Sequence, residues 1–323
     1  MSSPANEAAH IAHNVGRLCA NIGRVIQGKP DIIRDTVICL LAGGHLLLED
    51  VPGTGKTSLA RALASSLSVS WNRIQFTPDL LPSDVTGVSI FNQASAEFEF
   101  RPGPIFANIV VADEINRASP KTQSALLEVM EEGTLSNDGL VYQMPEPFMV
   151  VATQNPIDME GTYVLPEAQL DRFLMKLSVG YPSAEAEAAV LRTQKMGATV
   201  TRLQPVLCGQ DIVAMMDGVT RIEVAPVIEE YIVAITAATR TMSELRLGVS
   251  PRGSLALLRA ARAAAGATGR AFVVPEDVKS MANAVLAHRV ILQPDAELQG
   301  RTGDEMITRA VQSVPVPRSV SAR

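Results

Sequence analysis

The stretch LLLEDVPGTGKTSLA, residues 46–60, decides how the rest of the chain is interpreted. It begins as an apolar strand, passes through a glycine-rich loop and continues as a helical pattern, which is the setting of a phosphate-binding loop. Gly53 and Gly55 let the backbone N–H groups turn toward a phosphate. Lys56 offers a positive charge to the β and γ phosphates, and the hydroxyl of Thr57 can bind Mg²⁺. The N-terminus of the following helix adds its dipole.

One position of this loop departs from the usual pattern GxxxxGK[ST], because Asp50 stands where glycine is expected. The half of the loop that holds phosphate is complete. A chance Gly-Lys-Thr in an unrelated loop is the alternative, and the preceding strand and following helix disfavour it. We therefore predict an ATP-binding loop formed by Val51, Pro52, Gly53, Thr54, Gly55, Lys56 and Thr57.

Two further apolar strands end in polar residues. IVVADE, residues 109–114, would place two carboxylates at the carboxyl edge of a parallel sheet, beside the phosphate loop. Asp113 can hold Mg²⁺ through its water shell, and Glu114 can deprotonate the attacking water. In VVATQNP, residues 150–156, Asn155 can hydrogen-bond that water or the γ-phosphate. Each of these strand ends alone is weak evidence for a catalytic site. Their order after a phosphate-binding loop strengthens the prediction.

The pattern of elements predicts the fold class. Short apolar strands alternate with helices up to Gly180-Tyr181-Pro182, which indicates an α/β fold with a parallel sheet. Beyond this point the patterns are mainly helical and rich in alanine and leucine. We predict a nucleotide-binding core over residues 1–182, a small all-helical domain over 183–310 and a disordered tail over 311–323.

Composition excludes several other classes. The net charge of −6 disfavours a protein that lives on duplex DNA. The three cysteines lie far apart, which disfavours zinc. The longest apolar stretch, Val37–Leu48, is about half the length that spans a bilayer. The first residues lack the pattern of a signal peptide, so we expect a cytoplasmic protein.

Taken together, these motifs resemble those of the AAA+ ATPases, and their amino-acid sequences resemble the MoxR branch. The matching stretches run from about residue 20 to 295 and are LLLEDVPGTGKT, RIQFTPDLLPSDVTG, FRPGPIFANIVVADEINRASPKTQSALLEVMEE, VVATQNP and LPEAQLDRF. The resemblance implies a P-loop core with a five-stranded parallel sheet, a helical lid and assembly into a ring. Both glycine and aspartate occur at position 50 in this branch.

The resemblance also implies roles for residues outside the loop. Arg172 matches the arginine finger, which neutralises charge on the γ-phosphate bound by the neighbouring subunit. Arg252 matches the second sensor, a lid residue that touches the nucleotide of its own chain. Gln27 and Gly28 match the segment that contacts adenine. Without the resemblance, Arg172 is better explained as a surface arginine paired with a nearby carboxylate. A turn at Gly28 likewise needs no ligand.

The resemblance further implies a molecular function and interaction partners. Members of the family act as chaperone-like remodellers, commonly as hexameric rings, on protein clients and with partners that carry a von Willebrand factor A domain. Two inserted hairpins are expected, at 88–100 and 134–144, and in ring ATPases such hairpins face the pore and grip substrate. Leu140, Val141 and Tyr142 could contact a polypeptide, although apolar hairpin residues commonly serve local packing.

Three other functions compete with this prediction. A GTPase or small-molecule kinase is disfavoured because TQNP lacks the lysine and acid that read guanine, and a kinase needs no second-sensor lid. A scaffold with little turnover is disfavoured by Glu114, Asn155 and Arg172, which are all present. An ATPase that acts on nucleic acid is disfavoured by the acidic charge and the lack of a basic aromatic patch.

Overall fold

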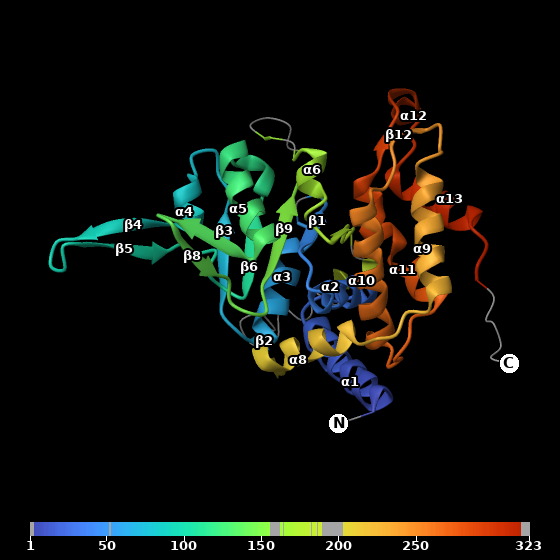
Figure 1. Cartoon of the computed structure of the whole chain (residues 1–323), viewed down its shortest axis with the longest axis horizontal. Helices are drawn as coiled ribbons and strands as arrows, with labels where there is room; N and C mark the ends of the chain where they lie inside the picture. Colours follow the sequence, from blue (N-terminus) through green and yellow to red (C-terminus); the bar gives the residue numbers. More distant parts are fainter. Residues whose placement is uncertain are drawn as a thin grey trace. The chain divides into compact units, whose positions relative to one another are not determined.

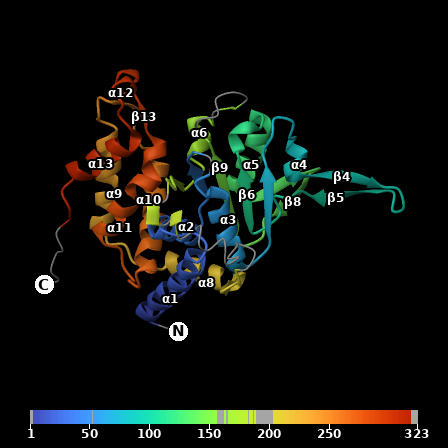
Figure 2. The same ribbon diagram turned by 180° about the vertical axis from the view of Figure 1, so that it is seen from behind.

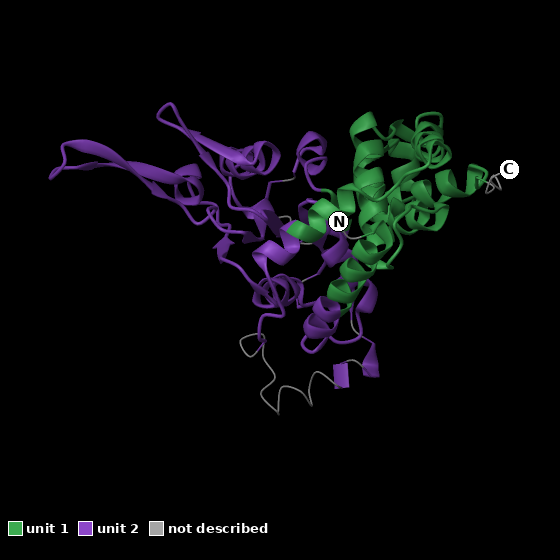
Figure 3. Cartoon of the chain, turned by 60° about the horizontal axis from the view of Figure 1, so that its bottom comes forward, with its two compact units in different colours: residues 1–16, 174–176, 214–323 green, residues 17–173, 177–213 purple. Residues whose placement is uncertain are grey.

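The computed structural model describes residues 3–51, 53–155, 162–163, 165–181, 183–185, 187–188 and 203–317, which form two compact units (Figure 3). The sheet unit contains residues 17–173 and 177–213, and the helical unit contains residues 1–16, 174–176 and 214–323.

This division differs from the boundary predicted near residue 182. Leu207–Cys208 (β11) pairs in parallel with Leu67–Ser68 (β2), so the chain returns to the sheet unit after residue 182. The first sixteen residues join the helical unit, where Glu7 pairs with Arg221. Both contacts link residues that are far apart in sequence, which local patterns do not reveal.

A five-stranded sheet with the order β10-β1-β9-β6-β3 confirms the predicted fold class, and β1, β9, β6 and β3 lie in the sheet unit (Figure 1). Neighbouring strands from β1 to β3 run parallel. The strands are β1 (Leu46–Glu49), β3 (Trp71–Gln75), β6 (Ile109–Asp113), β9 (Met149–Gln154) and β10 (Met175–Leu177).

Helices cover both faces of this sheet (Figures 1 and 2). Helix α5 (Pro120–Glu132) buries Leu126 and Met130 in a core with Val110 and Val150 of the strands. Helix α3 (Lys56–Ser65) contacts β6 and β9 and buries its leucines. Strands buried on both faces explain the continuous apolar runs in the sequence. This unit also contains α2 (Pro30–Leu41), α4 (Pro82–Thr86), the 3₁₀ turn η1 (Ile115–Arg117) and α6 (Glu167–Leu170).

His45, which precedes β1, is a packed residue. Its ring accepts a hydrogen bond from Val150 N at Nδ1, and Nε2 donates to Met130 O at 2.9 Å. The ring meets Phe148 edge-on at 5.5 Å between centroids. Both ring nitrogens therefore bind backbone between the sheet and α5, which leaves the imidazole without a chemical role.

Both predicted hairpins are present. They are β4 (Gly87–Asn92) with β5 (Glu97–Pro102), and β7 (Thr134–Asn137) with β8 (Leu140–Gln143). Asp138 and Gly139 both have positive φ, at 50° and 78°, which is the turn that Asp-Gly predicts.

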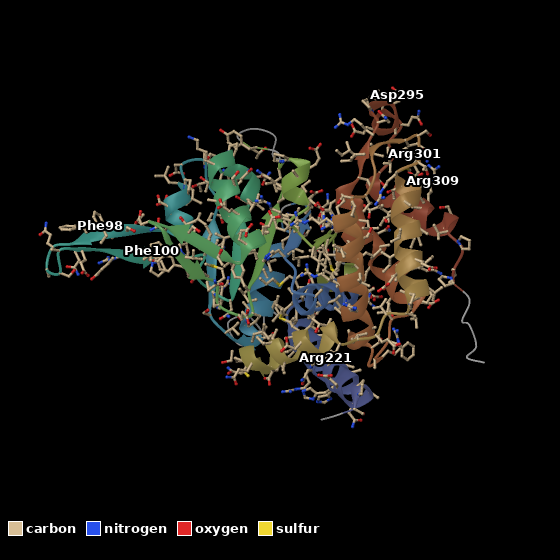
Figure 4. All side chains as sticks on the ribbon, viewed as in Figure 1. Phe98, Phe100, Arg221, Asp295, Arg301 and Arg309 are labelled. Atoms are coloured by element: carbon tan, nitrogen blue, oxygen red, sulfur yellow. The ribbon has the colours of Figure 1, made fainter. Side chains whose placement is uncertain are left out.

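Side chains tie the two hairpins to each other. Asn137 Nδ2 donates to Ser89 Oγ at 2.8 Å, and Ser89 Oγ donates to Asp138. The ring of Tyr142 lies 4.3 Å from that of Phe100, a hairpin residue labelled in Figure 4. Tyr142 therefore serves local packing, while Leu140 and Val141 are exposed.

The helical unit packs long helices closely through small side chains. Helix α10 (Pro251–Ala267) contacts α9 (Pro226–Thr239) and α11 (Pro275–Leu286). A Cβ on Gly253 would lie 3.5 Å from the Leu286 side chain of α11 and only 2.4 Å from the side chain of Val249, which precedes α10, so this position requires glycine. The unit also contains a short antiparallel pair, β12–β13, whose strands are too short to give a period-two signal.

The end of the chain is helical further than the sequence predicts. Helix α13 (Gly303–Ser313) crosses the expected tail boundary at 310, because Ala310 is buried on its apolar face. Residues 318–323 of the expected tail lie outside the described residues. The other elements are α1 (Pro4–Gly23), α8 (Gly209–Thr220), β12 (Leu245–Leu247), η3 (Ala287–Arg289), β13 (Ile291–Leu292) and α12 (Pro294–Leu298).

No helix in the described part of the chain is long and apolar enough to cross a membrane.

Candidate functional site

A cavity of ≈ 340 Å³ lies at the carboxyl edge of the sheet, where the strand ends meet the phosphate loop. This is the place where open α/β sheets bind ligands. The residues that line the cavity come from the loop and from β3, β6 and β9, and they are Gly53, Gly55, Lys56, Thr57, Ser58, Arg73, Gln75, Asp113, Glu114, Thr153, Gln154 and Asn155.

The loop has the backbone of an anion cradle. Gly53 and Gly55 have φ of 85° and 92°, and no heavy atom lies within 4 Å of a Cβ built on either. The left-handed backbone therefore requires glycine here, whereas space does not. Thr54 Oγ1 donates to Val51 O at 3.1 Å and closes the loop. Pro52 of the predicted loop lies outside the described residues.

Lys56 carries the positive charge of the loop. Its Nζ donates to the backbone oxygens of Asp50 and Val51, the latter at 3.1 Å. Burial lowers the pKa of Lys56, against the opposing pull of nearby carboxylates such as those of Asp50 and Glu114. An anion in the cavity would favour the charged amine, so this lysine fits a phosphate ligand.

Asp50 has a structural role that explains its place in the loop. Its Oδ1 accepts from Val51 N at 2.7 Å. Its Oδ2 accepts from Ser178 Oγ at 3.2 Å and from the N–H of Gly180. A glycine at position 50 could make none of these side-chain bonds. The aspartate therefore ties the start of the phosphate loop to the segment that follows β10.

Thr57 and Asp113 form an oxygen pair that fits Mg²⁺. Thr57 Oγ1 donates to Asp113 Oδ1 at 2.9 Å, inside the cavity and next to the Lys56 loop. A hydroxyl oxygen can bind Mg²⁺ directly, and a carboxylate beside it can hold the metal through its water shell. These two residues would hold the metal.

Glu114 lines the cavity and has a left-handed backbone, with φ 56° and ψ 49°. Such a conformation costs energy in a residue other than glycine and is concentrated at functional sites. The carboxylate accepts from Gln75 Nε2 and from Arg117 Nη1, both at 2.9 Å. The side chain is about a third exposed, so water reaches it. This placement fits a base that takes a proton from water.

Comparison with known proteins places the chain in a family. Residues 45–175 match the model of the ATPase family associated with various cellular activities (AAA), and residues 237–310 match the AAA lid domain. The chain is 40% identical to Chaperone MoxR1 of Mycobacterium tuberculosis, over 98% of this chain and 88% of that protein. It is 33% identical to Protein MoxR of Paracoccus denitrificans, over 92% and 95%. The chain belongs to the MoxR family of AAA+ ATPases.

Two further relatives match along nearly the whole of this MoxR-family chain. YeaC of Bacillus subtilis is 51% identical, over 95% of this chain and 96% of its own length. The crystal structure of a candidate ATPase from Cytophaga hutchinsonii is 36% identical and superposes with a TM-score of 0.89, over 97% and 98% of the two chains. The match to the lid model lies within the helical unit.

Asn155 lies where the MoxR-type sequence predicts, at the end of β9 and on the cavity wall. It is buried, and its backbone oxygen accepts from Asn116 Nδ2 at 3.2 Å. Gln27 and Gly28 occupy the turn between α1 and α2 and are absent from the cavity lining. Their contact with adenine stays a prediction.

Neither of the two arginines assigned from the family is among the residues that line the cavity. Arg172 follows α6 and pairs with Glu131 of α5, with 2.9 Å between Nε and Oε2. An arginine that acts on the neighbouring subunit need not line the cavity of its own chain. Arg252 is the second residue of α10 in the helical unit, and its action on the nucleotide stays a prediction.

The sequence did not single out Ser58, Arg73, Gln75, Arg117, Thr153 and Gln154 as residues of the site. Arg73 and Gln75 end a parallel strand, so the rule that strand ends share one edge could have placed them here. Thr153 precedes Asn155 by two positions and carries a hydroxyl directly after the apolar run Met149–Ala152. No local signal marks Arg117.

Thr153 provides the first prediction. Its buried hydroxyl donates to Asp113 Oδ1 at 3.1 Å and accepts from Glu114 N at 2.9 Å. Thr153→Val leaves both groups without this partner and should lower the free energy of unfolding by about 1–3 kcal/mol. Urea denaturation followed by the fluorescence of Trp71, the single tryptophan, reports on the same sheet. Thr153→Ser keeps the hydroxyl and should lose much less, and equal losses would contradict the hydrogen-bond explanation.

Proposed function

We propose that this MoxR-family chain binds Mg-ATP in the cavity, hydrolyses it, and uses the energy to remodel or mature protein complexes. The observation that carries the proposal is the meeting of Lys56, Thr57, Asp113 and Glu114 around one cavity, although they come from separate elements. The similarity to a relative named Chaperone MoxR1 supports the chaperone-like role.

Each residue has a defined task in this reaction. Lys56 and the N–H groups of the loop bind the phosphates, and Thr57 with Asp113 holds Mg²⁺. A bound Mg²⁺ would neutralise charge on the phosphates. Glu114 takes the proton of the attacking water, and Asn155 orients that water or the γ-phosphate.

Assembly completes the site in this proposal. Arg172 of one subunit would stabilise charge on the γ-phosphate bound by its neighbour, so the active form is a ring, and we propose a hexamer. Arg252 would report the nucleotide state as a movement of the lid. A partner with a von Willebrand factor A domain would link the ring to its protein client.

Loss of the loop lysine tests nucleotide binding directly. Lys56→Ala should abolish binding of Mg-ATP, because the loop from Asp50 to Thr57 contains no other cation to meet the β and γ phosphates. Isothermal titration calorimetry measures the affinity. Lys121→Ala removes an exposed lysine from α5 and should bind as the wild type does. Undiminished affinity in the Lys56 variant would refute this site.

A further inference from the structure

Arg73, at the end of β3, makes a close ion pair with the carboxylate assigned to the metal. Arg73 Nε lies 2.6 Å from Asp113 Oδ2. The side chain of Asp113 is 3% exposed, whereas that of Arg73 is 48% exposed. The guanidinium therefore balances a buried negative charge from the side of the cavity that faces water.

Protein groups bind both oxygens of this carboxylate. Asp113 Oδ1 accepts from the hydroxyls of Thr57 and Thr153, and Oδ2 accepts from Arg73. The hydroxyls are neutral and can stay beside a cation, since their oxygen can also face it. The guanidinium has donors only and is always charged, so it repels an arriving cation.

Arg73 also has a second acceptor that would hold it when it leaves Asp113. Its Nη2 donates to Gln75 Oε1 at 2.9 Å, on the same strand and the same cavity wall. A half-exposed guanidinium with such a neighbour can move a short distance at small cost, because water solvates it.

We propose that Arg73 is a positioning residue that contends with Mg²⁺ for Asp113, balancing the carboxylate before the metal binds and yielding when it does. The inference rests on the proposed function, because it takes Asp113 as the metal-holding residue. It goes beyond that function by assigning to Arg73 a control over how strongly metal and nucleotide bind together.

The test measures the coupling between metal and nucleotide without turnover. The dissociation constant of a non-hydrolysable ATP analogue is determined by calorimetry in EDTA and in saturating Mg²⁺. The coupling is the constant in EDTA divided by the constant in Mg²⁺, so a larger ratio means that the metal strengthens nucleotide binding more. Arg73→Gln removes the competing charge, so the ratio should rise roughly threefold to tenfold above that of the wild type. Arg34→Gln is the matched control, because Arg34 is also half-exposed and pairs with a carboxylate, that of Asp35, but does not line the cavity, and its ratio should stay unchanged.

A second variant guards against misfolding. Arg73→Lys keeps the charge but lacks the fork that reaches Asp113 and Gln75 together, so its ratio should rise by less than that of Arg73→Gln. If Arg73→Gln does not fold, as judged by circular dichroism, a rise in the Arg73→Lys ratio supports the proposal, and its absence counts against it.

The outcomes separate this inference from the proposed function. If the wild-type chain binds the analogue but the ratio of the folded Arg73 variants is unchanged or lower, Arg73 does not contend with the metal and only the inference fails. If the wild-type chain does not bind the analogue in either condition, the proposed function fails and the inference with it.

Discussion

Glu114→Gln should bind ATP almost as the wild type does and lose turnover by roughly 10²–10⁴-fold, the range for a general base. Glutamine has the same shape, and its amide oxygen can still accept from Gln75 Nε2, but it cannot take a proton from water. Steady-state phosphate release gives the turnover, and calorimetry with Mg-ATP gives the affinity.

Two features make this result specific to Glu114. Glu132→Gln changes an exposed carboxylate at the end of α5 and should leave turnover unchanged. The exchange alters only the side chain, so the backbone N–H of residue 114 can still donate to Thr153 Oγ1. Turnover near that of the wild type would mean that another residue deprotonates the water. The slowed, ATP-bound form would also suit a search for the protein client by pull-down.

Mixing two inactive chains should restore part of the ATPase activity, if Arg172 acts on the neighbouring subunit. Arg172→Ala lacks the finger and Lys56→Ala lacks the loop charge, so each alone should be inactive. In a mixed ring, some intact loops face an intact finger. At an equal ratio with free exchange, about one quarter of the interfaces have this arrangement. Phosphate release is measured against the mixing ratio, after light scattering has shown that subunits exchange.

A double variant supplies the control for this experiment. Lys56→Ala with Arg172→Ala contributes neither loop nor finger, so mixing it with the Arg172→Ala chain should restore nothing. Activity that stays at zero for every ratio of the single variants, with exchange shown, would contradict the ring. Full activity of the Arg172→Ala chain alone would leave the arginine as the partner of Glu131 and nothing more.

The sequence predicted the elements of the site because each has a local pattern. The loop needs glycines before Lys56, a buried strand needs an apolar run, and the hairpin turn needs Asp138-Gly139. Each requirement is met by neighbours in the chain, so residue types alone reveal it. The parallel order then places Asp113 and Asn155 at one edge, and the structure brings both to the cavity.

The division into units was less predictable. Residues 203–213 follow the helical texture of the second half, yet β11 pairs with β2 of the sheet unit. A two-residue strand carries no periodicity, so nothing in the sequence around Leu207 marks this return. The tie between the two hairpins depends in the same way on a partner, since Tyr142 meets Phe100 across a long separation in sequence.

By itself, then, the sequence determined the phosphate loop, the strand ends that face it and the family to which they belong. Only the tertiary structure decided which side chains share a hydrogen bond. It shows that Asp50 holds Gly180, that Thr153 joins Asp113 to Glu114, and that Arg73 balances Asp113. The physical reason is that hydrogen bonds and ion pairs require approach within about 3 Å, and this approach is set by packing between distant segments.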